Sequence, residues 1–266
     1  MTACWKPSAP KCSKPSPKKL KIPSPRILTR REAPALADFE AGVALPVDKP
    51  AGLTSFAVVR RLRRRTGVKK AGHTGTLDPA ATGLMIVLTG RATRWQDHFM
   101  RGEKEYLATV LLGVETDTWD LDGEVTARGE AAGLTRESVE ALLRERFTGD
   151  LEQTPPAYSA LKIAGVPSYR LARKGQAVEL KPRRVTVHSL VLEAWNPPEL
   201  TLRLACSSGF YVRSLAHDLG RALGCGATLK ALIRTRAGGL SLDDAWNLET
   251  LEETLSQMTG KGTWPT

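Results

Sequence analysis

Residues 72–83 read GHTGTLDPAATG and place a single carboxylate, Asp78, among glycine, threonine and proline. Glycine tolerates positive φ, proline fixes φ, and threonine or aspartate side chains bond the nearby backbone, so this composition predicts a shaped loop. A carboxylate in such a loop is positioned rather than packed. Taken alone, an Asp-Pro pair in a loop is more often an ordinary turn than a site. The rest of the chain has to decide between the two.

The positive charge of the chain is concentrated near its start. The formal net charge is +11, and residues 1–31 hold nine Lys or Arg and no acid, which leaves about +2 for the remainder. The same segment has six prolines and few large apolar residues, so we expect residues 1–38 to form a disordered basic tail. Any basic surface on the folded body must therefore be local.

Several classes of protein are disfavoured by the sequence. No apolar run approaches the length of a membrane span, and P-loop, Rossmann and HExxH motifs are missing. The four histidines are scattered, and the four cysteines show neither metal-ligand spacing nor a disulfide pattern. We therefore expect a cytoplasmic protein with no membrane contact and no metal, in which Cys206 packs as a small hydrophobe.

Alternating and helical patterns of apolar residues predict the fold class. We expect strands over residues 43–47, 84–88, 106–112 and 200–206, and helices over 55–66, 139–147 and 212–223. Because strands and helices do not alternate regularly, the pattern favours an α+β domain around a largely antiparallel mixed sheet, flanked by helices and loops. We assign this domain to residues 39–251 and a short C-terminal tail to residues 252–266.

The helix predicted over residues 55–66 carries an unusual charge pattern. Val58, Val59 and Leu62 share one face. The pattern places five arginines on the other face: Arg60, Arg61, Arg63, Arg64 and Arg65. With two lysines just beyond the helix, seven cations fall within eleven residues without an acid among them. A solvated helix face is the alternative, but we favour binding of RNA phosphates. The residues assigned to these contacts are Arg60, Arg61, Arg64, Lys69 and Lys70.

Four further segments, read in order after residues 72–83, carry a family resemblance. They are KEY at 104–106, LGVETDTWDLDG at 112–123, PPAYSALK at 155–162 and CSSGFYVRSLAHDLG at 206–220. Together they resemble the TruB family of pseudouridine synthases, the bacterial tRNA pseudouridine-55 synthases, from about Gly42 to Leu251. The resemblance implies the pseudouridine synthase fold and isomerisation of uridine to pseudouridine at position 55, in the T loop of tRNA. That chemistry needs neither a redox cofactor nor a metal.

The resemblance also assigns the catalytic residues. It implies that Asp78 is the essential aspartate and that Arg213 faces it and keeps it ionised and oriented. The target base has to leave its stack, and the resemblance places Tyr106 beneath the flipped base. It further assigns residues that bind the substrate nucleotide, namely His73, Tyr106, Tyr211 and Leu232. The Leu232 assignment is the weakest match, because residues 231–234 depart from the family's commoner Leu-Arg-Arg run.

The same resemblance predicts the binding partners of the protein. We expect a monomer that binds the T stem-loop of tRNA and needs no obligate protein partner. Family members commonly carry a C-terminal RNA-binding domain of the PUA type, and we expect none here. Two alternatives stay open at this point: a pseudouridine synthase acting on another RNA, and a non-catalytic protein that binds or folds tRNA on the same scaffold.

Overall fold

One large sheet runs through most of the chain in the computed structural model, which describes residues 23–163, 165–176, 178 and 180–259. Its strands are β1 (Arg26–Ile27), β2 (Val43–Lys49), β3 (Ala71–His73), β4 (Thr82–Thr89), β5 (Lys104–Leu112), β8 (Gly149–Gln153), β11 (Arg183–Asn196), β12 (Glu199–Cys206), β13 (Ala227–Ala237), β14 (Leu240–Ser241) and β15 (Trp246–Asn247). The main path is β1-β2-β4-β13-β5-β12-β11-β8. Most neighbours are antiparallel, as the sequence predicted, while β1 with β2, β4 with β13 and β2 with β15 are parallel.

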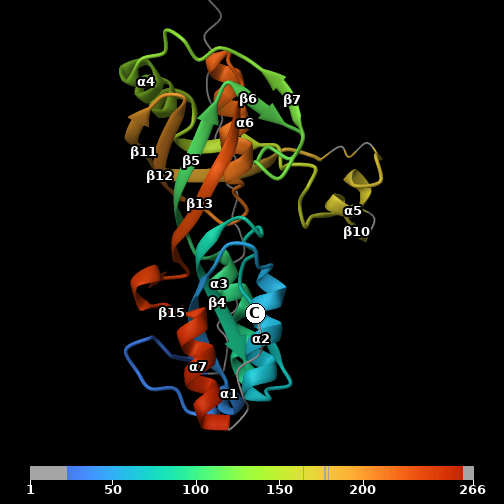
Figure 1. Ribbon diagram of the computed structural model, residues 1–266, viewed down its shortest axis with the longest axis vertical. Helices are drawn as coiled ribbons and strands as arrows, with labels where there is room; N and C mark the ends of the chain where they lie inside the picture. The colour runs from blue at the N-terminus through green and yellow to red at the C-terminus, as the bar shows by residue number, and fades with distance from the viewer. Residues whose placement is uncertain (1–22, 164, 177, 179, 260–266) are drawn as a thin grey trace, which may run out of the picture.

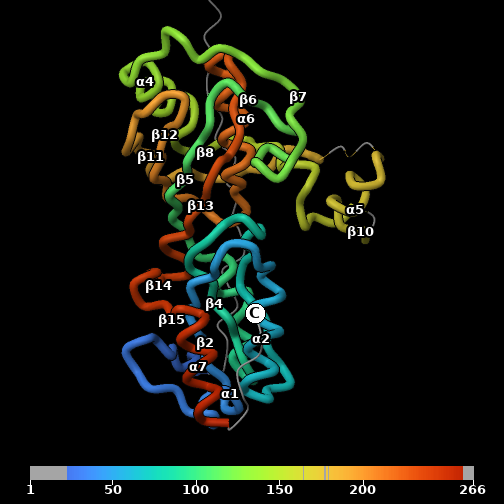
Figure 2. Tube along the Cα trace, viewed as in Figure 1, coloured from blue at the N-terminus to red at the C-terminus, as the bar shows by residue number. Residues whose placement is uncertain are grey.

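The helices and the two small sheets complete the fold. The helices are α1 (Leu36–Ala41), α2 (Ser55–Thr66), α3 (Gln96–Arg101), α4 (Arg136–Arg146), α5 (Ser168–Ala172), α6 (Val212–Leu223) and α7 (Leu248–Thr259), with the 3₁₀ turns η1 (Gly90–Trp95) and η2 (Leu242–Asp244). The small sheets are β6 (Val114–Thr116) with β7 (Val125–Arg128), and β9 (Lys162–Ile163) with β10 (Val166–Pro167). Figure 2 shows that α5 and β10 project to one side of the body. No helix within the described ranges is both long and apolar enough to cross a membrane.

The predicted ends of α2 are confirmed by its caps. The Thr54 hydroxyl accepts a hydrogen bond from the Ala57 N–H at 3.1 Å, which satisfies one of the free donors of the first turn. Gly67 ends the helix with φ of 73°, a left-handed conformation that glycine adopts without the steric cost of a Cβ. Gly224 ends α6 in the same way, with φ of 77°.

In the lower half of Figure 1, β2 and β4 are buried on both faces. The helices α2 and α7 cover one face through Val58, Leu62, Leu251 and Leu255, while η1 and α3 cover the other. Burial on both sides explains why residues 84–88 form a continuous apolar run instead of alternating.

In the upper half, the sheet is buried on one face only. Alternate residues of β5 and β12 are buried, among them Ala108, Val110, Leu202 and Leu204. They pack against α6 and α4 in one apolar cluster, which also contains Cys206 as predicted. Burying a Leu or Val side chain stabilises a fold by about 1.5–3 kcal/mol, so this cluster supplies much of the stability of the upper half.

The two halves meet where β13 runs beside β4. Only two residue pairs form this parallel contact, Ile233 with Thr82 and Arg234 with Gly83. Gly83 has φ of 97°, and a Cβ there would lie 2.5 Å from the Arg234 carbonyl oxygen. Glycine is therefore required at this crossing, and the crossing lies at the end of the Asp78 loop.

The predicted tail boundaries differ from the structure at both ends. Within residues 23–38, β1 pairs with the edge of β2, Leu28 is fully buried, and Arg26 forms ion pairs with Glu32 and Asp38 at 2.8 and 2.5 Å. These ion pairs and the burial of Leu28 hold the segment against the body of the protein. At the other end, α7 continues to Thr259 and buries Leu255. Residues 1–22 and 260–266 lie outside the described residues.

We predict that Gly220→Ala destabilises the protein. Alanine normally stabilises a helix interior by about 1 kcal/mol relative to glycine. At Gly220 in α6, however, the new Cβ would lie 2.1 Å from the Ala227 backbone nitrogen, so helix and strand would have to separate. Urea unfolding should show a loss of about 1–3 kcal/mol, the usual cost of overpacking. A variant as stable as wild type would contradict the close packing of α6 on β13.

Candidate active site

Asp78 is held by a loop that is anchored from both sides. The Ser55 hydroxyl donates to the Leu77 carbonyl at 3.0 Å and accepts from the Leu77 N–H at 2.9 Å, so α2 clamps the residue just before the aspartate. On the other side the Ala81 N–H donates to the Asp78 carbonyl at 3.1 Å. Leu77 and Ala81 are buried in the cluster of the upper half. The loop is thereby fixed, while the Asp78 side chain stays 42% exposed.

Lys49 holds the same loop through hydrogen bonds from its ammonium group. Its ammonium group is fully buried and donates to the carbonyls of Pro50, Leu53 and Pro79, at 2.8, 2.8 and 3.1 Å. Burial lowers the pKa of Lys49 to about 8, although the nearby Asp78 carboxylate acts to raise it. Lys49 therefore ties the backbone at Pro50 and Leu53 to Pro79, the residue that follows Asp78.

Arg213 contacts Asp78 directly. One guanidinium nitrogen lies 3.0 Å from the Asp78 carboxylate, and the other lies 3.5 Å from the carboxylate of Asp120. The same two nitrogens donate to the carbonyls of Tyr158 at 2.9 Å and Thr118 at 3.1 Å. Because the Arg213 side chain is only 7% exposed, these contacts replace the water that a guanidinium otherwise needs.

A second loop, residues 116–123, holds Arg213 on the side away from Asp78. The Asp120 carboxylate accepts from the Thr118 hydroxyl at 2.5 Å, and burial raises the pKa of this carboxyl. Trp119 adopts φ of 63°, which is rare for a large side chain, and its ring stacks on His217 at 4.3 Å between centroids. His217 lies one helical turn after Arg213 in α6, so this stacking fastens the loop to the helix that carries the arginine.

Tyr106 lies opposite Arg234 where β5 pairs with β13. Burial raises the pKa of the Tyr106 hydroxyl, a hydrogen bond with the Arg234 side chain acts to lower it, and the Asp78 charge acts to raise it. The Arg234 guanidinium is itself buried and donates to the carbonyls of Leu84 at 2.6 Å and Gly75 at 3.2 Å. Arg234 therefore ties the tyrosine to both ends of the Asp78 loop.

The other predicted substrate-binding residues border this group. Burial and the Arg234 charge lower the pKa of His73, which ends β3 just before the loop. Burial raises the pKa of Tyr211, and the charges of Arg213 and Asp78 also act on it. The Tyr211 backbone is fixed by a pair of hydrogen bonds with the Gln153 amide, at 2.8 and 3.0 Å. Leu232 lies two residues before Arg234, on the same face of β13, and is partly buried.

The structure thus brings Asp78, Arg213 and Tyr106 together with residues that the sequence analysis did not assign. Arg234 and Asp120 are the main additions. A signal for Asp120 was present, because it lies within the DTWD segment quoted for the resemblance. The sequence analysis considered Arg234 only as one of residues 231–234, which depart from the family's usual sequence. The burial of Arg234 depends on the pairing of β13 with β4, which the local sequence does not reveal.

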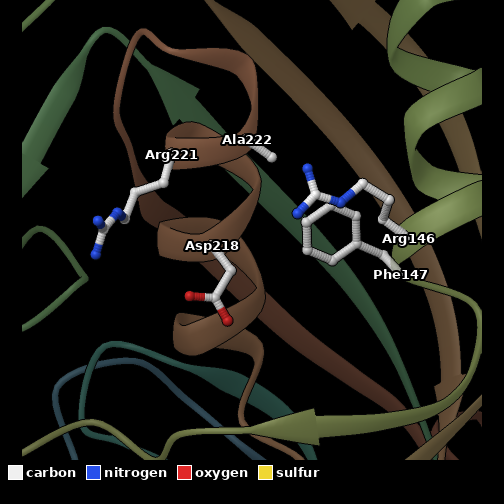
Figure 3. Close-up of a pocket in the computed structure, with 5 residues that line it drawn as sticks. All are labelled: Arg146, Phe147, Asp218, Arg221 and Ala222. Carbon is white, nitrogen blue, oxygen red and sulfur yellow. The ribbon is translucent and has the colours of Figure 1, made fainter.

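A hollow between α4 and α6 lies apart from this site. A cavity of about 480 Å³ lies between the end of α4 and α6, and Figure 3 shows the five residues that line it: Arg146, Phe147, Asp218, Arg221 and Ala222. The Asp218 and Arg221 side chains point in different directions from α6. None of the predicted catalytic residues lines this cavity. Across the described residues, no group of three or more His, Cys, Asp or Glu is arranged to hold a metal ion.

Comparison with known sequences identifies the family. Residues 63–212 match the N-terminal domain of TruB family pseudouridylate synthases, and residues 213–263 match the C-terminal domain of tRNA pseudouridylate synthase B. This chain belongs to the TruB family. It is 46% identical over 226 residues to the tRNA pseudouridine synthase B of Phocaeicola vulgatus, covering 83% of this chain and 96% of the relative. The corresponding protein of Desulfotalea psychrophila is 50% identical over 215 residues, covering 78% and 86%.

Solved structures of pseudouridine synthases share this fold. A chain of the Cbf5-Nop10-Gar1 complex superposes with a TM-score of 0.65 at 27% identity, covering 86% of this chain and 60% of that one. A chain of an H/ACA ribonucleoprotein bound to a substrate RNA superposes with a TM-score of 0.64 at 23% identity, covering 93% and 63%. This chain spans less than two thirds of either. The predicted family and α+β pseudouridine synthase fold are confirmed, and the enzyme is a pseudouridine synthase.

We predict that Arg234→Lys slows the enzyme without unfolding it. Lysine keeps the charge but lacks the planar fork that reaches Leu84, Gly75 and Tyr106 together. The Asp78 loop and the tyrosine would then shift apart, and a displacement of about 1 Å can slow a reaction about 100-fold. Single-turnover pseudouridine formation should fall by that order, while Arg236→Lys, at an exposed position of the same strand, should keep the wild-type rate. Equal rates for the two variants would contradict this role.

The depressed pKa of Lys49 predicts a pH dependence of stability. Between pH 8 and 10.5 the unfolded chain binds the Lys49 proton and the native protein does not, so the free energy of unfolding rises with pH. Relative to Lys49→Met, wild type should gain about 3 kcal/mol over this range in urea unfolding. Below pH 7 the difference should stay constant, because the lysine is protonated in both states. A difference that is flat from pH 7 to 10.5 would exclude the depressed pKa.

Proposed function

We propose that this protein isomerises uridine to pseudouridine at position 55 in the T loop of tRNA. The observation that carries the proposal is the ion pair between Asp78 and the buried Arg213, adjacent to Tyr106. The names of the two relatives, tRNA pseudouridine synthase B, support tRNA as the substrate.

Asp78 is the catalytic group of the proposal. The reaction breaks the N1–C1′ bond of the uridine, rotates the detached base and joins C5 to C1′, after which C5 loses a proton and N1 gains one. An anionic carboxylate beside the sugar can stabilise positive charge that develops at C1′. Arg213 holds this carboxylate from behind, which leaves the 42% exposed side chain open toward the substrate. The Asp120 carboxylate and the carbonyls of Thr118 and Tyr158 hold the Arg213 side chain in place when the substrate lies next to Asp78.

The substrate-binding residues supply the pocket for a flipped base. Extrusion of a nucleotide costs a few kcal/mol, and stacking on an aromatic ring returns about 1–3 kcal/mol. In the proposal Tyr106 provides this ring, Tyr211 and Leu232 line the pocket, and His73 accommodates the nucleotide. Burial lowers the pKa of His73, so it stays neutral near pH 7 and acts as a hydrogen-bonding group rather than as a cation.

The proposal extends to the partner and the setting. The T stem-loop is recognised through its shape and backbone more than through a long sequence. We assign catalysis to the monomer, because Asp78, Tyr106, Arg213 and Arg234 all come from one chain. The proposed location is the cytoplasm, where tRNA is modified.

Pseudouridine mapping on an unmodified tRNA transcript tests this function. Wild type should place pseudouridine at position 55 (tRNA numbering). Asp78→Asn keeps the size of the side chain and removes its charge, so it should bind the transcript and form no pseudouridine. Modification at another position, or in another RNA only, would reject tRNA position 55 as the target. Binding without modification by wild type would favour the non-catalytic tRNA-binding alternative.

A further inference from the structure

The exposed face of α2 combines one aromatic ring with a row of cations. Phe56 is 63% exposed, and Arg60, Arg63 and Arg64 follow it at four, seven and eight positions. These spacings place the four side chains on one side of a helix. An exposed phenylalanine next to several arginines fits no role in the core, since Val58, Val59 and Leu62 already bury the opposite side.

The cations surround a hollow at the end of this helix. A cavity of about 280 Å³ is lined by the last exposed turn of α2 and the residues that follow it: Arg60, Arg63, Arg64, Gly67, Val68 and Lys69. The helix C-terminus points its carbonyl dipoles into the same region, which eases the repulsion among the cations but leaves their positive field directed outward. The hollow has the charge of an anion-binding site.

These cations also lack carboxylate partners. Within the described part of the chain, no ion pair is formed by Arg60, Arg63, Arg64 or Lys69. Two arginines of the predicted cluster differ. Arg61 points toward α7, where it lies 3.6 Å from Glu252, and Arg65 is buried, so the prediction that Arg65 belongs to the exposed face is wrong. Hence the exposed basic surface of α2 lacks Arg61 and Arg65, which the sequence analysis placed on it, and keeps Arg63.

Both ends of α2 connect directly to the catalytic loop. At its start, Ser55 clamps Leu77 next to Asp78, and Phe56 is the following residue. At its end, Lys69 and Lys70 lead through β3 into His73 and the loop. A helix of 12 residues is about 18 Å long, so a polynucleotide that leaves the active site has several phosphates within reach of the hollow.

We propose that this α2 surface, defined as Phe56, Arg60, Arg63, Arg64 and Lys69, is a second RNA-binding site of the enzyme. It would take the sugar–phosphate backbone of a segment outside the target loop in the hollow, and an unstacked base on Phe56. The inference rests on the proposed function in one respect, that the ligand is the RNA whose uridine is modified. Arg60, Arg61, Arg64, Lys69 and Lys70 were assigned to phosphates from sequence. The inclusion of Arg63 and Phe56, the loss of Arg61 to an ion pair with Glu252, and the separate roles of ring and cations come from the structure.

The cations are tested by the salt dependence of affinity. Wild type, Arg63→Gln/Arg64→Gln and the control Arg144→Gln/Arg146→Gln, with two arginines changed on α4, are titrated with an unmodified tRNA transcript at several salt concentrations. Each lost phosphate contact lowers the slope of log K against log salt by about 0.7–0.9. The α2 variant should therefore lose about 1.5 in slope and about 30-fold in affinity at 0.1 M salt.

The ring is tested by a change that leaves the charge constant. Phe56→Ala should weaken binding roughly 5- to 100-fold, the range of base stacking on an aromatic side chain, with an unchanged salt slope. Val191→Ala, which removes an exposed apolar side chain 55% accessible on β11, should bind as wild type. A fall in slope for the arginine variant together with a constant slope for the phenylalanine variant is the signature expected.

The outcomes separate this inference from the proposed function. If wild type modifies the transcript while the α2 and α4 variants lose the same slope and affinity, the effect is one of overall charge and the second site is rejected. An unchanged affinity in both Phe56→Ala and the α2 arginine variant also rejects it. If the α2 variants lose binding to anionic lipid vesicles but bind RNA as wild type, the surface belongs to a membrane. A wild type that binds without modifying overturns the proposed function alone.

Discussion

The buried guanidinium of Arg213 constrains the site more than any other single group. A cation that is 7% exposed must find its hydrogen-bond acceptors inside the protein, and these come from three separate segments: the Asp78 loop, the 116–123 loop and the chain at Tyr158. Removing one partner of a buried ion pair typically costs about 3–5 kcal/mol. This cost keeps the three segments in fixed positions around Arg213. Of its two carboxylate partners, Asp78 is the more exposed, at 42% against 15% for Asp120, which makes it the one that a substrate can reach.

Two further buried cations, Lys49 and Arg234, act on the backbone instead of on carboxylates. Lys49 donates to three carbonyls and Arg234 to two, all of them in or next to the Asp78 loop. Carbonyl partners hold these cations in place without neutralising them, so their charge is felt at the surrounding groups. Burial is the main cause of the lowered pKa of Lys49 and of His73, and the charge of Arg234 acts to lower both further. The catalytic loop is therefore shaped by cations on one side and by apolar packing of Leu77 and Ala81 on the other.

The sequence predicted what depends on neighbouring residues and missed what depends on distant ones. The α2 helix was predicted to its caps, because Thr54, the apolar stripe and Gly67 all lie within the segment itself. The pairing of Asp78 with Arg213 came through the family resemblance, since 135 positions separate them. The role of Arg234 was missed because it arises where β13 crosses β4. The ordered structure of residues 26–38 was missed because it depends on the pairing of β1 with β2, which is a tertiary contact.

The narrow crossing of β4 and β13 has a consequence for the synthesis of the protein. The chain leaves the ribosome from its N-terminus, so β2, α2 and β4 of the lower half emerge with Asp78 long before Arg213 and Arg234 have been translated, whereas α7 of the same half follows them. Leu77 and Ala81 have no cluster to enter until the strands and helices of the upper half follow. A partly made chain thus carries the reactive carboxylate without the groups that orient it. The site is therefore complete only after β13 has been translated and has closed the sheet, when the two halves share one reaction centre.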